Sequence, residues 1–153
     1  MGLVQTWVEA NGLKLHPTKT RIVEAATESF SFLGYEFRGR LRLPRPQSLA
    51  QLKDQVRPQT RRTSGDSLAC IIARLNQTLR GWFEYFGHCS PTVYPDLDSW
   101  VRGRLRGLLR QRQGQPGRGR GADHQRWSNA YFAEPGLYSL SATHVRWCQS
   151  PSG

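Results

Sequence analysis

Arginine is the residue type in this chain with the clearest chemical potential. The 153 residues include 22 Lys and Arg against 11 Asp and Glu, which gives a formal net charge of +11 at pH 7 and a pI near 10.6. Lysine contributes only Lys14, Lys19 and Lys53. Guanidinium groups bind phosphate through paired hydrogen bonds and stack on bases, so the composition favours a nucleic-acid partner. A GC-rich genome would account for the ratio of arginine to lysine but not for the net charge.

Paired carboxylates, the usual ligands for divalent metal chemistry, are nearly absent. Asp96 and Asp98 form the only closely spaced acidic pair. Phosphoryl transfer with two metal ions needs carboxylates that hold both ions. Side chains two positions apart on a helix point in different directions, so a role in capping a helix start explains this pair better. We therefore expect no catalytic residue, no metal ion and no cofactor here.

The cysteines argue against both a disulfide framework and a zinc site. Cys70, Cys89 and Cys148 are odd in number and widely spaced, and no Cys-x-x-Cys pair occurs. His88 beside Cys89, or His144 with Cys148, matches no standard spacing of metal ligands. Cys70 is expected to be a small core residue.

One helix, expected over residues 68–86, organises the chain. Its apolar residues recur at steps of three and four, which predicts one buried face. They are Leu68, Ile71, Ile72, Leu75, Leu79, Trp82, Phe83 and Phe86. Asp66 and Ser67 suit the N-cap position. Gly81 costs about 1 kcal/mol relative to alanine, so we expect another backbone, RNA or protein, to approach it. Trp82 is expected to be buried rather than to stack on bases.

Shorter elements precede this helix. A helix is expected to end at Gly12, and alternating patterns predict strands between residues 13 and 23. A β-hairpin is expected over residues 30–43, with its turn at residues 38–40. A short helix over residues 48–56 follows.

A second long helix and a basic segment complete the expected organisation. After a polar, flexible loop at residues 57–62 and the long helix, another helix is expected to start at Asp96 or Asp98. Residues 113–122 are rich in Gly, Gln, Arg and Pro, which is typical of a linker. The expected division of the chain is 1–45, 46–112, a linker at 113–125, a segment at 126–143 that docks on the helices, and a tail at 144–153.

The long helix carries a resemblance to a known family. Its sequence LNQTLRGWFEYF resembles the LN-x-x-LRGW-x-x-YF core of the maturase-specific region (domain X, the thumb) of group II intron reverse transcriptases. DLDSW-x-R-x-RLR, from Asp96, and W-x-N-x-YF-x-x-x-GL-x-SL, from Trp127, are similar to later parts of that thumb. The resemblance implies a three-helix thumb.

Two earlier segments resemble the end of the palm of the same enzymes. NGLKLHPTKT is similar to the GL-x-L-x-x-x-KT stretch, which implies that Lys19 lies near the phosphates of an incoming nucleotide. SFLGYEF resembles the block that holds the primer end in these polymerases. The matching residues, expected to be primer-grip-like, are Phe32, Leu33, Gly34 and Tyr35.

The catalytic part of the family is missing from this sequence. The family's metal-binding aspartates come from a Tyr-x-Asp-Asp turn and an earlier palm residue, and neither occurs here. The resemblance covers most of residues 7–140, so a truncated reading frame or a split-off fragment is expected. The isolated chain is expected to lack polymerase activity.

We therefore expect an α+β, mainly α protein, with a β-hairpin palm remnant leading into a three-helix thumb. The expected function is an RNA-binding maturase module that supports folding or splicing of intron RNA. The alternative is part of a split or truncated RNA-directed DNA polymerase, which needs a separately encoded fingers and palm and binds a primer–template duplex. A third possibility, a DNA-binding protein of unrelated ancestry, is supported by the net charge alone. No apolar run suggests a membrane span, so a cytoplasmic protein is expected.

The arginines provide the expected contacts to nucleic acid. Between Ser99 and Ala122 there are seven arginines and no acidic residue, and such a run repels itself unless an anion lies on it. The residues expected to bind nucleic acid are Lys19, Arg57, Arg61, Arg62, Arg74, Arg80, Arg102, Arg104, Arg106 and Arg110.

Overall fold

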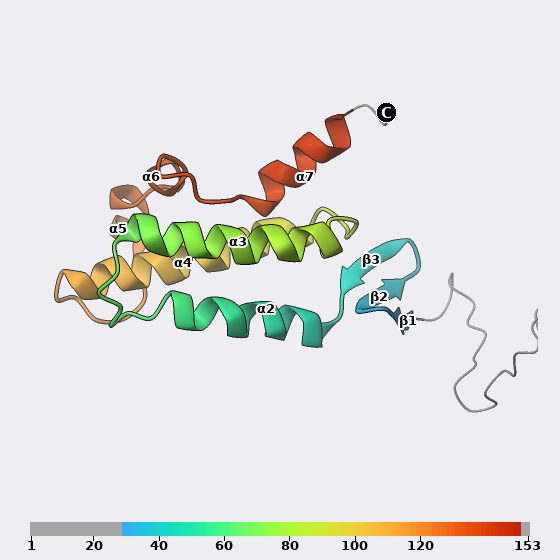
Figure 1. Cartoon of the computed structure of the whole chain (residues 1–153), viewed down its shortest axis with the longest axis horizontal. Coiled ribbons are helices and arrows are strands. Elements are labelled where there is room, and N and C mark those ends of the chain that lie inside the picture. Colours follow the sequence, from blue (N-terminus) through green and yellow to red (C-terminus); the bar gives the residue numbers. More distant parts are fainter. Residues whose placement is uncertain (1–28, 151–153) are drawn as a thin grey trace, which may run out of the picture.

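A small antiparallel sheet leads into a bundle of helices in this computed structural model, which describes residues 29–150 (Figure 1). The predicted helix end at Gly12, the strands between residues 13 and 23, and Lys19 lie outside the described residues. The sheet has the order β1-β2-β3. Its strands are β1 (Ser29–Phe32), β2 (Tyr35–Arg38) and β3 (Leu41–Pro44). The mainly helical α+β class expected from the sequence is confirmed.

The sheet contains one more strand than the predicted hairpin. The expected turn around Gly39 joins β2 to β3, but a second tight turn at Leu33 and Gly34 folds β1 back onto β2. Both turn residues have positive φ, +48° at Leu33 and +85° at Gly34, as a two-residue type I′ turn requires. Leucine is a poor residue for that conformation, which is why the alternating pattern on both sides resembled one continuous strand.

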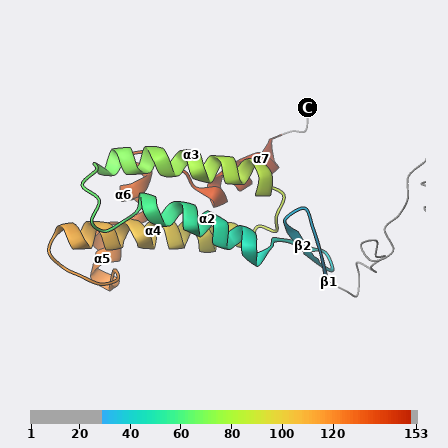
Figure 2. The same cartoon turned by 60° about the horizontal axis from the view of Figure 1, so that its bottom comes forward.

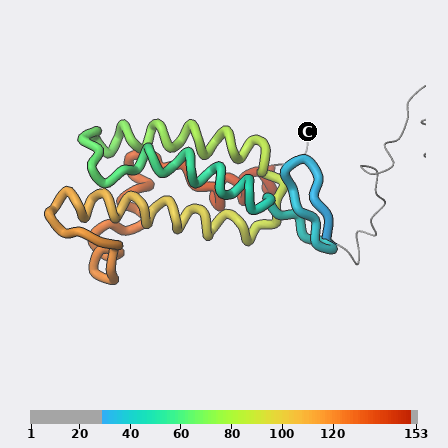
Figure 3. Tube along the Cα trace, turned by 90° about the horizontal axis from the view of Figure 1, so that it is seen from below, coloured from blue at the N-terminus to red at the C-terminus, as the bar shows by residue number. Residues whose placement is uncertain are grey.

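Three long helices run side by side, with the sheet at one end and α5 at the other (Figures 2 and 3). They are α2 (Pro46–Gln59), α3 (Leu68–Phe86) and α4 (Val93–Arg112). Two of these helices differ from their predicted bounds. Helix α2 continues to Gln59, so Arg57 is helical rather than part of a flexible loop. Helix α4 begins at Val93, because Pro95 falls in its first turn, where a missing N–H removes no hydrogen bond.

The core lies where α3 faces the other helices. Ser67 caps α3 as predicted, with its Oγ accepting a hydrogen bond from the Cys70 N–H at 3.2 Å. The predicted face is mostly confirmed, since these residues of α3 are buried: Ile71, Ile72, Leu75, Leu79, Phe83 and Phe86. Trp82 is only half-buried, stacked on Phe86 at 4.8 Å between ring centroids. Cys70 is exposed, so its predicted core position was wrong. In the described part of the chain, nothing lies within 4 Å of a Cβ placed on Gly81.

Three helices follow the bundle, where the sequence predicted a linker, a docking segment and a tail. They are α5 (Gly121–Arg126), α6 (Asn129–Ala133) and α7 (Leu140–Gln149). Residues 121–126 are therefore helical rather than linker. Helix α7 packs against α4 and α3, so residues 144–149 are not a tail. Ser139 caps the N-terminus of α7, and the carboxylate of Asp98, on α4, accepts a hydrogen bond from the first turn of α7. These two contacts explain why residues 144–149 are helical.

Candidate nucleic-acid interface

The end of the bundle opposite the sheet collects four segments that are rich in arginine. There the end of α2, the start of α3, the end of α4 and helix α5 lie close together (Figure 3). Arg61 and Arg62 are exposed in the loop that follows α2, and Arg118 is exposed in the segment before α5. This arrangement brings together residues that are far apart in the sequence.

Arg104 joins α4 to the end of α2. Its Nε donates to Thr60 Oγ1 at 3.0 Å, and its Nη2 donates to the carbonyl oxygens of Arg57 at 3.3 Å and Thr60 at 3.5 Å. The last carbonyl groups of a helix lack partners within the helix, so a guanidinium placed here caps α2. Burial lowers the pKa of Arg104, and the nearby charges of Arg57 and Arg62 lower it further. The guanidinium therefore lies in a locally positive environment.

Trp100 lies at the centre of a group of cations. The centroid of the Trp100 ring lies 5.4 Å from Lys53 Nζ, 6.0 Å from Arg57 Cζ and 5.9 Å from Arg104 Cζ. Cations within about 6 Å of an indole face are attracted by its quadrupole. Trp100 therefore holds positive side chains from α2 and α4 on one side of the bundle.

A cleft of about 500 Å³ opens between α2, α4 and the segment before α5. We call it the α2–α4 cleft, and its walls include Arg62, Trp100, Gly103, Arg104, Arg118 and His124. Gly107 allows Arg62 to lie against α4, since a Cβ placed there would be 3.4 Å from Arg62 Nε. No carboxylate lines this cleft within residues 29–150.

Arg106, one of the residues expected to bind nucleic acid, is buried within the protein. It is only 3% exposed. Its Nε donates to the Trp127 carbonyl oxygen at 2.8 Å and its Nη2 donates to Asn129 Oδ1 at 2.9 Å. Its Cζ lies 5.5 Å from the centre of the Phe132 ring. Arg106 therefore fastens the segment around α6 to α4.

Arg110 and Arg112 also make contacts within the protein. Arg110 Nη1 lies 2.7 Å from Asp123 Oδ2 in a largely buried ion pair. The carboxylate of Asp123 also accepts a hydrogen bond from the Arg120 N–H. Arg112 donates to the carbonyl oxygens of Ser64 and Asp66. These contacts engage two of the seven arginines between Ser99 and Ala122, of which Arg110 but not Arg112 was expected to bind nucleic acid.

The remaining predicted arginines lie in three different settings. Arg57 pairs with Asp54 on α2, and Arg74 pairs with Asp66 before α3. Arg80 lies 5.7 Å from the Tyr138 ring, on α3 and outside the α2–α4 cleft. The predicted set is therefore spread over the bundle rather than gathered on one face.

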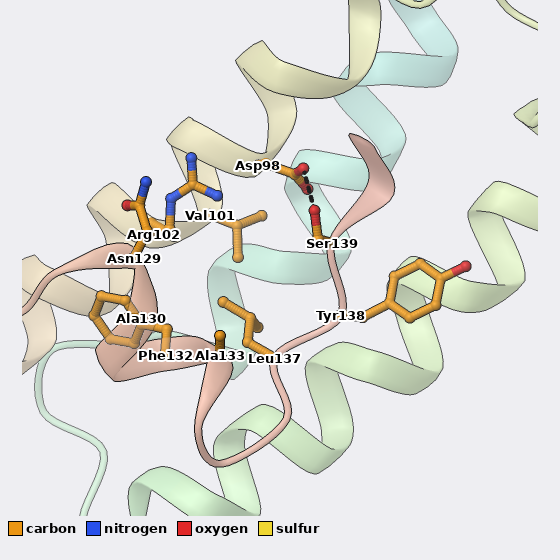
Figure 4. Close-up of a pocket in the computed structure, with 10 residues that line it drawn as sticks. All are labelled: Asp98, Val101, Arg102, Asn129, Ala130, Phe132, Ala133, Leu137, Tyr138 and Ser139. Atoms are coloured by element: carbon orange, nitrogen blue, oxygen red, sulfur yellow. Dashed lines mark hydrogen bonds between the residues drawn. The ribbon is translucent and has the colours of Figure 1, made fainter. Parts of the chain in front are cut away.

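A second cavity, of about 250 Å³, lies between α4 and the segment from α6 to α7 (Figure 4). Its carboxylate, Asp98, is fully engaged: it accepts from Ser139 Oγ at 2.9 Å and from the N–H groups of Leu140 at 2.9 Å and Ser141 at 3.0 Å. The sequence correctly predicted a capping role, but the capped helix is α7 rather than α4. Arg102 is half-buried at the cavity wall, and its Nε has no partner within residues 29–150.

The primer-grip-like residues form the β1–β2 turn. Phe32 and Leu33 are 62% and 68% exposed. The turn is held from behind, because Tyr85 donates to the Leu33 carbonyl oxygen at 2.5 Å and Tyr35 donates to the Tyr85 carbonyl oxygen. The Gly34 carbonyl oxygen accepts from the Arg45 N–H at 2.8 Å. Two apolar side chains therefore project from a turn fixed by α3 and the start of α2.

Sequence reasoning missed four residues that shape the α2–α4 cleft: Thr60, Trp100, Arg118 and His124. Thr60 and Trp100 were not among the residues expected to bind nucleic acid, and residues 113–125 were treated as a linker. The excess of arginine between Ser99 and Ala122 was the only sequence signal for Arg118. No group of three or more potential metal ligands occurs in the described part of the chain.

The fold and the arginine-rich end define a basic, helical domain. Residues 49–127, from α2 through α5, match the family model of the group II intron maturase-specific domain. The match covers more than half of the chain, so the chain belongs to this family, as its sequence motifs predicted. No curated protein matches the chain significantly. Within residues 29–150, no helix has the length and apolarity needed to cross a membrane.

Proposed function

We propose that this chain is an RNA-binding maturase module that holds structured intron RNA and supports its folding or splicing without catalysing a reaction itself. Membership of the maturase-specific family favours intron RNA as the partner. The proposed contact surface is the arginine-rich end of the bundle. It includes Arg57, Arg61, Arg62, Arg104 and Arg118.

The observation that carries this proposal is the excess of arginine over carboxylate. Within residues 29–150 there are 18 arginines, and four of them form ion pairs with carboxylates. Arg61, Arg62 and Arg118 are exposed and form no ion pair in that range. Like charges held close together raise the free energy of the free protein, and RNA phosphates would relieve that repulsion.

The salt dependence of RNA binding tests this proposal. Each neutralised phosphate contributes roughly −0.7 to −0.9 to the slope of log K against log salt. We expect Arg61→Gln with Arg62→Gln to flatten the slope by about 1.5. Fluorescence anisotropy with a structured intron RNA, from low to moderate salt, measures it.

A matched variant controls for net charge. Arg40→Gln with Arg146→Gln removes two exposed arginines, one from the β2–β3 turn and one from α7. We expect this variant to keep the wild-type slope. Equal slopes for both double variants would mean that charge alone attracts RNA, without a defined surface. Stronger binding to duplex DNA than to the intron RNA would favour a DNA-binding protein instead.

The second candidate function is part of a split RNA-directed DNA polymerase, with a primer–template duplex as its ligand. The exposed Phe32 and Leu33, on a turn fixed by Tyr85, favour it, since such a turn suits a surface that holds a primer or contacts a palm. Primer extension on an RNA template with Mg²⁺ should give no product with this chain alone, because the sequence lacks the Tyr-x-Asp-Asp motif. Activity restored by a separately supplied fingers and palm would support this candidate.

A further inference from the structure

The α2–α4 cleft is a recess between α2, α4 and the segment before α5. Its volume of about 500 Å³ falls within the range of roughly 300–1,000 Å³ that is typical of sites for small ligands. The phosphates of an RNA duplex lie along the outside of the helix, where they contact side chains that project from a protein surface. A recess is better suited to a nucleotide that projects out of the duplex.

The polar groups of the cleft come from three separate segments and converge. Arg104 comes from α4 and is fixed by Thr60 and the end of α2. Arg62 comes from the loop after α2 and lies beside Gly107 of α4. Arg118 comes from the segment before α5, which approaches α4 closely enough that a Cβ on Gly119 would lie 3.4 Å from Arg106 Cβ. Three guanidinium groups therefore surround one space.

These guanidinium groups keep unused donors. Arg104 commits its Nε and Nη2 to α2, and its Nη1 has no hydrogen-bond partner within residues 29–150. Arg62 and Arg118 form no hydrogen bond or ion pair through their side chains in that range. Positioned arginines bind phosphate oxygens with strong, charge-assisted hydrogen bonds. An aromatic ring and an imidazole, from Trp100 and His124, complete the walls.

We propose that the α2–α4 cleft receives one unstacked nucleotide of the RNA, with its phosphate bound by Arg62, Arg104 and Arg118. This proposal rests on the proposed RNA-binding function and adds a preference for a particular shape. RNA presents single nucleotides outside the helix at bulges and loops, and proteins recognise RNA chiefly at such places. The chain then distinguishes a bulged helix from a fully paired one without reading the paired bases.

Two glycine substitutions test the proposal without changing the charge. Gly103 lines the cleft and is exposed, and a Cβ placed on it would meet nothing within 4 Å among the described residues. Gly103→Leu therefore fills the cleft with an apolar side chain. Gly81 is likewise exposed with open space around it, but lies on α3 outside the cleft, so Gly81→Leu is the matched control. Leucine is a better helix former than glycine, so both variants should fold.

The measurement compares two RNAs at one salt concentration: a paired RNA hairpin and the same hairpin with one unpaired nucleotide in its stem. We expect the wild-type protein and Gly81→Leu to bind the bulged RNA about tenfold more tightly, the value of roughly one charge-assisted hydrogen bond. Gly103→Leu should bind both RNAs with the affinity that the wild type has for the paired hairpin. Arg62→Gln with Arg118→Gln should also lose the preference.

Two outcomes would overturn the proposal: equal binding of both RNAs by the wild-type protein, or an unchanged preference in Gly103→Leu. Both leave RNA binding itself intact. Failure of the proposed function would differ, because then neither RNA would bind with a strong salt dependence.

Discussion

The guanidinium of Arg106 donates to the carbonyl oxygen of Trp127 at 2.8 Å, and this bond links the middle of α4 to the segment that leads into α6. The same guanidinium reaches Asn129 and lies against the Phe132 ring. Burial lowers the pKa of Arg106, and the nearby charge of Arg102 lowers it further, yet an arginine remains charged at neutral pH. A buried cation without a carboxylate is thus stabilised by oxygen acceptors and an aromatic face.

Arg106→Met should destabilise the fold, because it removes the donors and leaves the Trp127 carbonyl oxygen buried without this partner. We expect a loss of about 1–3 kcal/mol in the free energy of unfolding, measured by urea denaturation. Arg61→Met, at an exposed position, should change stability by less than about 0.5 kcal/mol. Similar stability of the two variants would show that the Arg106 contacts add nothing to the fold.

Asp98→Asn should loosen α7. The carboxylate of Asp98 accepts three hydrogen bonds from the start of that helix, and an amide offers one oxygen where the carboxylate offers two. We expect a cost of about 1–3 kcal/mol and faster hydrogen exchange at the α7 amides. Asp96→Asn is the matched control, since Asp96 is exposed in the first turn of α4. Unchanged exchange in α7 would contradict the capping role.

The buried carboxylate of Asp123 should make stability depend on pH in the acid range. The N–H of Arg120 and the guanidinium of Arg110 hold the pKa of Asp123 below its ordinary value of 3.8. A folded-state pKa lower than the unfolded one gives a contribution that is present above 3.8 and is lost as the pH falls through the folded value. Asp123→Asn should therefore be less stable than wild type near neutral pH, and the two proteins should converge in acid.

Urea denaturation of both proteins across the acid range measures this difference. The ion pair of Asp66 with Arg74 is present in both proteins, so its own pH dependence cancels in the comparison. A difference that stays constant down to the lowest pH would mean that ionisation of Asp123 does not contribute to stability.

The helices and the family could be predicted from the sequence because they depend on local patterns. The apolar period from Ile71 to Phe86 and the cap at Ser67 suffice to define α3, and LRGW-x-x-YF suffices to identify the family. The turn at Leu33 could not be predicted, since leucine rarely adopts a positive φ and the hydrogen bond to its carbonyl oxygen comes from Tyr85, 52 residues away. The tertiary roles of arginines could not be predicted either. Arg104 and Arg106 are two residues apart and both line the α2–α4 cleft, but Arg104 donates to the end of α2 whereas Arg106 donates to the segment before α6. The packing of the helices, and not the local sequence, decides between these roles.

Asp98 shows the same limit. The spacing of Asp96 and Asp98 indicated a capping role, but it did not indicate which helix would be capped. One of the three groups that donate to Asp98 is the N–H of Leu140, which is 42 residues away. Contacts at such separations depend on how α4 and α7 pack, and no local pattern contains that information.

The three cysteines provide a direct chemical test of the fold. Cys89 is 3% exposed, whereas Cys70 and Cys148 are exposed. Burial raises the pKa of the Cys89 thiol from 9.0 to about 12, which lowers its thiolate fraction at mildly basic pH about a thousandfold, and the thiolate is the reactive species. We expect two thiols to react quickly with a disulfide reagent in the native protein, and the third to react only after unfolding.

Cys89→Ser provides the control for this assignment. In native buffer the variant should still show two fast-reacting thiols. In denaturant it should show no third thiol. Its hydroxyl replaces a thiol packed beside Tyr94, whose own hydroxyl donates to the Phe86 carbonyl oxygen at 2.8 Å, so a modest loss of stability is also expected. If all three thiols of the wild-type protein react at one rate, Cys89 in the loop between α3 and α4 is not buried, and the packing described for that end of the bundle is wrong.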